Sequence, residues 1–90
     1  MELLKNVHLI LEANKAENIS ILDVKNKSSV TDYMLIASGR STRHIQAIAD
    51  NLIKKLKESK IKPIGIEGYN KSEWVLIDYG DILIHVMHPT

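Results

Sequence analysis

The chain lacks the residues on which several functional classes depend. None of its 90 residues is cysteine, which excludes a disulfide framework, a zinc finger and a thiol nucleophile. No apolar run approaches the ~20 residues that span a bilayer. The basic region that opens a signal peptide is also missing, since the second residue is the acidic Glu2. We therefore expect one domain over residues 1–90, a cytoplasmic location and no membrane partner.

Charge of one sign and aromatic residues are scarce as well. Twelve Lys and Arg residues face 11 Asp and Glu residues, which leaves a net charge of +1. The aromatic residues are Trp74, Tyr33, Tyr69 and Tyr79 alone. A dedicated nucleic-acid-binding domain usually has a basic excess and several stacking aromatics. The composition therefore does not favour a general RNA-binding module, although that alternative stays open.

Apolar periodicity predicts two helices. The first runs from about Glu2 to Asn14, where apolar residues recur at three- and four-residue spacing. The second runs from about Thr42 to Ser59 and has the strongest periodic pattern in the sequence. Ser41 or Thr42 is a suitable N-cap for it. Pro63 prevents the helix from continuing.

Apolar and β-branched runs predict five strands, at Ile19–Val24, Tyr33–Ala37, Ile64–Glu67, Glu73–Tyr79 and Ile82–Met87. The run at 33–37 is nearly continuous, which is typical of a strand covered on both faces. The order α-β-β-α-β-β-β indicates an α/β (α+β) fold, a mixed sheet of about five strands with the two helices packed on it. The helix at 42–59 is long enough for a crossover if the strands that flank it are parallel.

The last two strands are apolar on both faces. In the first of them, Trp74, Leu76 and Asp78 alternate with Val75, Ile77 and Tyr79. In the second, Leu83, His85 and Met87 alternate with Ile82, Ile84 and Val86. Two helices cover only one face of a five-stranded sheet. An apolar set therefore remains on the other face, which predicts a partner interface unless a loop or the N-terminal helix crosses it.

The turn from Ser38 to His44 lies between a predicted strand and a predicted helix. Its main-chain N–H groups could hold an anion beside Arg40 and Arg43, or the turn is simply a capped one that needs Gly39. It has neither the P-loop spacing nor the G-x-G-x-x-G spacing. A nucleotide- or phosphate-processing enzyme that uses this turn is therefore the alternative to a binding protein.

The remaining candidates for chemistry are poorly spaced. Asp78 and Asp81 are three residues apart across a turn, whereas a nucleotidyltransferase metal site needs two carboxylates one residue apart on a strand. We expect Asp81 to cap the turn and Asp78 to face solvent or a basic group of a partner. His85 and His88 project to opposite faces of a strand. We therefore expect no catalytic residue, no metal site and no cofactor.

Three segments resemble the ribosomal silencing factor S family, also called Iojap-related. They are DYMLIASGRSTRHIQAIAD at 32–50, IEGY at 66–69 and WVLIDYGDILIHVM at 74–87. The resemblance extends from about Leu3 to His88. Many members of that family continue into a helical tail, whereas this sequence ends at Thr90.

The resemblance implies a nucleotidyltransferase-like fold that has lost its catalytic carboxylates and acts by binding. It implies docking on the large ribosomal subunit, against universal large-subunit ribosomal protein fourteen, which blocks subunit joining and represses translation when nutrients are limiting. Relatives in organelles assist large-subunit assembly. The implied partner contacts are Trp74, Leu76, Asp78, Tyr79 and His85, and also Arg43 and His44. Contact with adjacent ribosomal RNA and a homodimer through the apolar face remain open.

Overall fold

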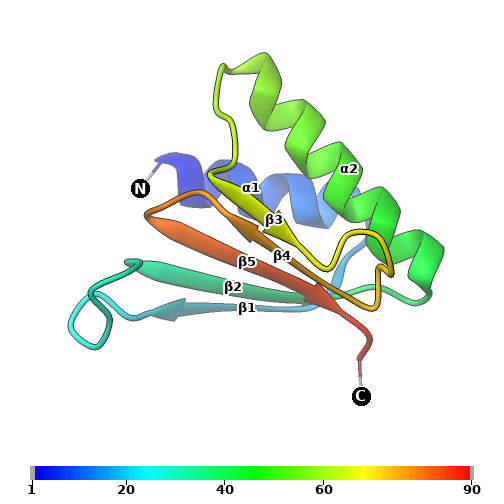
Figure 1. The fold of residues 1–90 in the computed structure, drawn as a ribbon, viewed down its shortest axis with the longest axis horizontal. Coiled ribbons are helices and arrows are strands. Elements are labelled where there is room, and N and C mark those ends of the chain that lie inside the picture. The colour runs from blue at the N-terminus through cyan, green and yellow to red at the C-terminus, as the bar shows by residue number, and fades with distance from the viewer. Residues whose placement is uncertain (1, 90) are drawn as a thin grey trace.

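The structure is a computed structural model that describes residues 2–89. Its helices are α1 (Glu2–Ala13) and α2 (Thr42–Glu58). Its strands are β1 (Glu17–Asp23), β2 (Tyr33–Ser38), β3 (Gly65–Glu67), β4 (Trp74–Asp78) and β5 (Ile82–Met87). The predicted order α-β-β-α-β-β-β is therefore confirmed (Figure 1). In the described part of the chain, neither helix combines the length and the apolar character needed to cross a membrane.

The five strands form one mixed sheet in the order β1-β2-β5-β4-β3. The pairing of β2 with β5 is parallel, and the other three pairings are antiparallel. Because β3 is antiparallel to β4, and β4 to β5, strand β3 runs in the same direction as β2. The two strands that flank α2 are thus parallel members of one sheet, as a crossover through the helix requires.

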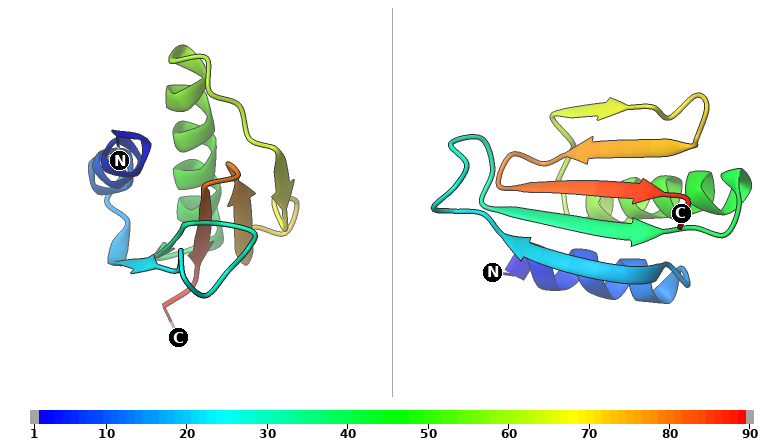
Figure 2. Two further views of the ribbon diagram at one scale, coloured as in Figure 1. Left: turned by 90° about the vertical axis from the view of Figure 1, so that its left-hand side faces the viewer. Right: turned by 90° about the horizontal axis from the view of Figure 1, so that it is seen from below.

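Both helices lie on the same side of the sheet (Figure 2, left). Between helices and sheet lies a core of residues that are almost completely buried: Val7, Leu11, Leu35, Ala37, Ile45, Ile48, Ala49, Leu52, Leu56, Val75, Ile77, Ile82, Ile84 and Val86. Burial of each large aliphatic side chain stabilises the fold by about 1.5–3 kcal/mol. Along β4, Val75 and Ile77 point into this core, whereas Trp74 and Leu76, which alternate with them, point to the other side of the sheet.

Element ends differ from the prediction where the backbone departs from regular geometry. Strand β1 begins at Glu17, two residues early, because a register shift between Glu17 and Ser20 lets the strand continue past Asn18, whose φ is 53°. Helix α2 begins after Ser41, whose Oγ accepts the His44 N–H at 3.0 Å, as a Ser N-cap does. The helix ends at Glu58, and Lys60 takes a left-handed conformation with φ 64°.

Candidate functional site

The sheet surface opposite the helices is uncovered over its central strands. Figure 2 (right) shows the strands in front and both helices behind them. The strand register places apolar and charged side chains on this surface beside Ser20 and Ser38, and we call this set the open face: Leu22, Met34, Ile36, Glu67, Trp74, Leu76, Asp78, Leu83, His85 and Met87. In one row across the sheet, Ile36 pairs with His85, and His85 with Leu76. The predicted uncovered apolar face is therefore present.

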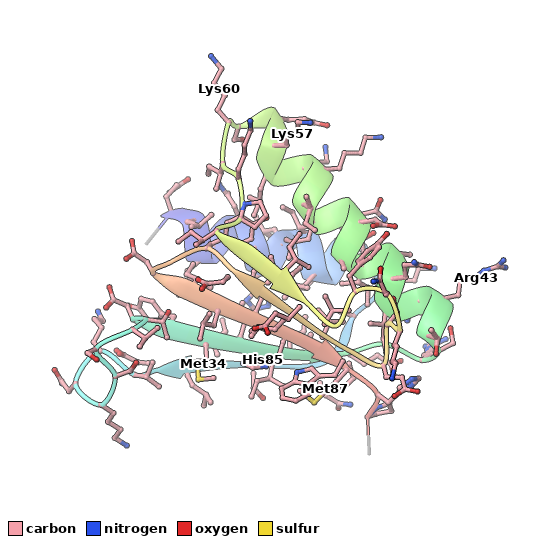
Figure 3. The ribbon with its side chains drawn as sticks, in the orientation of Figure 1. Met34, Arg43, Lys57, Lys60, His85 and Met87 are labelled. Carbon is pink, nitrogen blue, oxygen red and sulfur yellow. The ribbon has the colours of Figure 1, made fainter. Side chains whose placement is uncertain are left out.

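The open face is accessible to another molecule. Trp74 is 56% exposed and Leu22 is 45% exposed. Six further members of the face are half-buried: Met34, Ile36, Leu76, Leu83, His85 and Met87. The prediction that β2 is covered on both faces was wrong, because Met34 projects from that strand onto the open face (Figure 3) and Ile36, which pairs with His85, lies on the same face. The continuous apolar run hid this alternation.

Two aromatic rings on this face lie against each other. The centroids of the Trp74 and His85 rings are 5.7 Å apart, and the ring planes are inclined by 22°. The Trp74 Nε1–H donates a hydrogen bond to His85 Nδ1 at 3.1 Å. Burial lowers the pKa of His85 below its ordinary value of 6.5. An exposed indole and a neutral imidazole therefore form one contact on the surface.

Asp78 both closes the β4–β5 turn and contributes negative charge to the open face. Its Oδ1 accepts the Gly80 N–H at 2.7 Å. The expectation that Asp81 caps this turn was wrong, because Asp78 precedes the turn and its side chain folds back onto it. Asp81 acts instead through its main-chain oxygen, which accepts N–H groups of Asp32 and Tyr33 at 3.0 Å. Both charged members of the open face, Asp78 and Glu67, are acidic, so the face suits a partner with basic groups.

Tyr79 does not reach the open face. It alternates with Asp78 and is only 9% exposed, packed with the core. Burial raises the pKa of Tyr79 to about 12. Its hydroxyl has no hydrogen-bond partner within residues 2–89. The resemblance implied a partner contact here, but a buried ring has little surface to offer, so Tyr79 is left out of the proposed contact.

Arg43 and His44 also lie away from the open face, at the start of α2. Arg43 is exposed and points outward from the helix (Figure 3). Both ring nitrogens of His44 are engaged: Nδ1 accepts the Arg40 N–H at 2.9 Å, and Nε2 lies 2.9 Å from the main-chain oxygen of Asn14. Of the seven predicted contact residues, the structure thus brings together Trp74, Leu76, Asp78 and His85.

The turn from Ser38 to His44 uses its polar groups internally. The Arg40 guanidinium is paired with Glu17, with Nε and Nη2 both 2.9 Å from Oε2. A Cβ at Gly39 would lie 2.7 Å from Cγ1 of Ile45, so the glycine is needed for close packing. These contacts favour the capped-turn interpretation over a phosphate site. No group of three or more His, Asp or Glu residues in the described chain is placed to hold a metal ion.

Sequence reasoning missed the contributions of β1, β2 and β3 to the open face. Leu22, Met34, Ile36 and Glu67 join it because the register aligns them with residues of β4 and β5. Alternation of polar and apolar residues in β2 would have revealed Met34 and Ile36. That signal is missing because both faces of β2 are apolar.

Comparison with known proteins identifies relatives over nearly the whole sequence. The family described as "Ribosomal silencing factor during starvation" matches residues 1–90. A protein of Haemophilus influenzae named ribosomal silencing factor RsfS is 40% identical over 77 residues, which cover 86% of this chain and 76% of that protein. A mouse protein named for mitochondrial assembly of the ribosomal large subunit is 35% identical over 83 residues, covering 89% of this chain and 36% of its own length.

A solved structure has the same fold. The crystal structure of a protein from Chromobacterium violaceum superimposes with a TM-score of 0.94 and is 39% identical in sequence. The match covers 98% of this chain and 73% of that chain. The arrangement of two helices on a five-stranded mixed sheet is therefore shared with that protein.

Proposed function

Because the chain belongs to the ribosomal silencing factor family, we propose that it represses translation by binding the large ribosomal subunit. The contact is with universal large-subunit ribosomal protein fourteen, and the bound protein blocks joining of the small subunit when nutrients are limiting. It acts by binding and not by catalysis, in the cytoplasm where it meets ribosomes. Names of relatives that refer to ribosomal silencing and to the ribosomal large subunit support this proposal.

The observation that carries the proposal is the exposure of the open face. Contiguous apolar surface that a fold leaves uncovered marks a partner site more often than not. We expect Trp74 to contribute most to the binding energy of this face, because tryptophan is among the residues that dominate binding energy at interfaces. Next to it lie Leu76 and Met87, which can exclude water from the contact.

Steric exclusion explains how so small a protein blocks a large assembly. The described chain measures 33 × 30 × 22 Å along its principal axes. A body of this thickness, held where two subunit surfaces meet, keeps those surfaces apart. Repression then requires no catalytic step, only a complex that dissociates more slowly than the subunits join.

The charge of the open face bears on how the contact is oriented. Asp78 and Glu67 can face basic groups of the ribosomal protein, which sets register and association rate more than affinity. Adjacent ribosomal RNA is a further contact that Arg43 can reach only from another side of the molecule. A second copy of the chain is the competing occupant of the open face.

Sedimentation of ribosomal subunits tests the proposal. Added wild-type protein should comigrate with the large subunit and reduce the amount of joined particles. Trp74→Ala should weaken binding by roughly 30-fold or more, the loss expected at an interface hot spot. The matched control is Leu9→Ala on α1, because Leu9 is 55% exposed and Trp74 is 56% exposed. Equal binding by the wild type and Trp74→Ala would contradict the proposed contact, and binding to free RNA alone would favour an RNA-binding module.

A further inference from the structure

We propose that His85 is a positioning residue for Trp74, and that it holds the indole ready for docking only while its imidazole is neutral. The proposal rests on the proposed function, in which Trp74 makes the central apolar contact. His85 would then set the affinity of docking without itself contributing most of the contact area. Protonation of His85 in acid would therefore weaken docking.

The strand register explains why the two rings need a specific bond to stay together. Trp74 pairs directly with Met87, and His85 pairs directly with Leu76. Trp74 and His85 are therefore diagonal neighbours on adjacent strands, a separation that long aromatic side chains can bridge. A half-exposed indole has several staggered rotamers to choose from. The hydrogen bond from Trp74 Nε1 to His85 Nδ1, 3.1 Å long, selects the one that lies against β5.

The same hydrogen bond determines which ring nitrogen of His85 carries the proton. An indole nitrogen can only donate, so His85 Nδ1 must accept and cannot carry a proton. The single proton of the neutral ring is then on Nε2. That nitrogen is buried and has no hydrogen-bond partner in the part of the chain that the structure describes. An unpaired buried donor is unfavourable, so within residues 2–89 the bond with Trp74 is the one side-chain hydrogen bond that His85 makes.

The surroundings of His85 do not offer a partner that would replace Trp74. Strand β2 presents Met34, Ile36 and Ser38 on this side, and β1 presents Ser20 and Leu22. The titratable groups on the face are Asp78 of β4 and Glu67 of β3. Desolvation of the half-buried ring lowers the pKa of His85. When His85 is protonated, Nδ1 becomes a donor that faces the indole donor, and the bond that holds Trp74 is lost.

The isolated chain allows a direct measurement, because Trp74 is its single tryptophan. The NMR signal of the indole N–H reports whether the hydrogen bond is present. In the wild type this signal should shift as the pH falls, with a midpoint below 6.5. In His85→Asn, whose amide oxygen can accept the bond, it should stay in place at all pH values. In His85→Leu it should match an unbonded indole throughout, and the control His8→Asn on α1 should titrate like the wild type.

Binding to purified large subunits gives the functional readout. His85→Leu should bind about fivefold more weakly than wild type at neutral pH, the value of one neutral hydrogen bond. His85→Asn should recover most of that loss. On acidification through the midpoint of the indole signal, the wild type should lose affinity relative to His85→Asn. That comparison removes pH effects that arise in the subunit itself.

The two arms separate the possible failures. If His85→Leu binds as tightly as wild type while Trp74→Ala binds weakly, His85 does not position the contact, although the proposed function stands. If Trp74→Ala binds as tightly as wild type, the proposed function fails, and the docking role of His85 fails with it. An indole signal that ignores both pH and substitution at His85 overturns the positioning role whatever the subunits do.

Discussion

The His44 ring joins the start of α2 to the end of α1, with its Nε2 2.9 Å from the main-chain oxygen of Asn14. The other ring nitrogen, Nδ1, accepts the main-chain N–H of Arg40 at 2.9 Å. The two ring nitrogens therefore each contact one main-chain polar group, one on either side of the ring. The segment S-T-R-H thus places a histidine where it connects two elements that are 30 residues apart in sequence.

His44→Ala should therefore destabilise the fold without touching the open face. It removes two hydrogen bonds and leaves the Asn14 oxygen and the Arg40 N–H without a protein partner, which should cost about 1–3 kcal/mol. Urea unfolding measures the difference. The control is His8→Ala, because His8 forms only a solvent-exposed ion pair with Glu12, 3.6 Å long, worth about 0–1 kcal/mol. Equal loss in the two variants would contradict the connecting role of His44.

Tyr79→Phe should change the stability of the protein in alkali. Burial raises the pKa of Tyr79 to about 12, whereas an unfolded tyrosine titrates near 10. The contribution of Tyr79 to stability is therefore fully present below pH ~10 and is lost as the pH rises through ~12. Unfolding free energies measured across this range should fall more steeply for the wild type than for Tyr79→Phe, by on the order of 2 kcal/mol.

At neutral pH the same substitution should be neutral or slightly stabilising, because the Tyr79 hydroxyl has no partner in residues 2–89. Tyr69→Phe provides the contrast. The Tyr69 hydroxyl donates to Asp50 Oδ1 at 2.6 Å, and this bond is the main reason that the pKa of Tyr69 is raised. Its loss should lower stability at neutral pH, opposite in sign to Tyr79→Phe. A loss of more than about 1 kcal/mol in Tyr79→Phe at neutral pH would show that the hydroxyl is satisfied.

The sequence predicted the parts of this fold that depend on local patterns. The order of elements, the long amphipathic α2 and the two-faced apolar character of β4 and β5 all follow from spacing. The open face follows from geometry alone, since two helices cannot cover both sides of five strands. These features need only the identity of near neighbours along the chain.

Features that depend on register were beyond the sequence. The diagonal contact between Trp74 and His85 exists because Trp74 pairs with Met87, and the turn geometry sets that pairing. The choice of Asp78 over Asp81 as the turn cap depends on a single hydrogen bond. Tyr79 shows a different error: strand alternation already grouped it with Val75 and Ile77, and the family resemblance alone suggested a surface role.

Gly68→Ala should disrupt the connection that leads into β4. Gly68 has φ 77°, and an added Cβ would lie 2.0 Å from the main-chain oxygen of Trp74. A left-handed alanine costs about 1–2 kcal/mol, and the clash adds about 1–3 kcal/mol. The fold should lose stability and the indole N–H signal of Trp74 should move.

Gly65→Ala is the matched control for this prediction, because nothing lies within 4 Å of a Cβ added at Gly65. It removes a glycine from β3, three residues before Gly68, so any general effect of replacing a glycine in this part of the chain appears in both variants. Thermal unfolding should separate them clearly, with Gly65→Ala close to the wild type. Comparable melting temperatures for the two variants would mean that the backbone at Gly68 can rearrange.

Asp78 combines a structural and an electrostatic contribution, and two substitutions separate them. Asp78→Asn keeps an oxygen that can accept the Gly80 N–H, now 2.7 Å from Asp78 Oδ1, while it removes the charge. Asp78→Ala removes both. Asn should therefore keep stability within about 0.5 kcal/mol of the wild type, whereas Ala should lose about 1 kcal/mol or more.

Large-subunit binding should respond to the charge and not to the turn. If Asp78 faces basic groups of the ribosomal protein, Asp78→Asn should slow association and weaken its dependence on salt, because rim charges act chiefly on the association rate. Asp78→Ala should show the same kinetic change once its lower stability is taken into account. Stopped-flow or surface-based association rates at two salt concentrations measure this. An unchanged rate in Asp78→Asn would mean that Asp78 serves the turn alone, and that the apolar residues around Trp74 determine docking without electrostatic guidance.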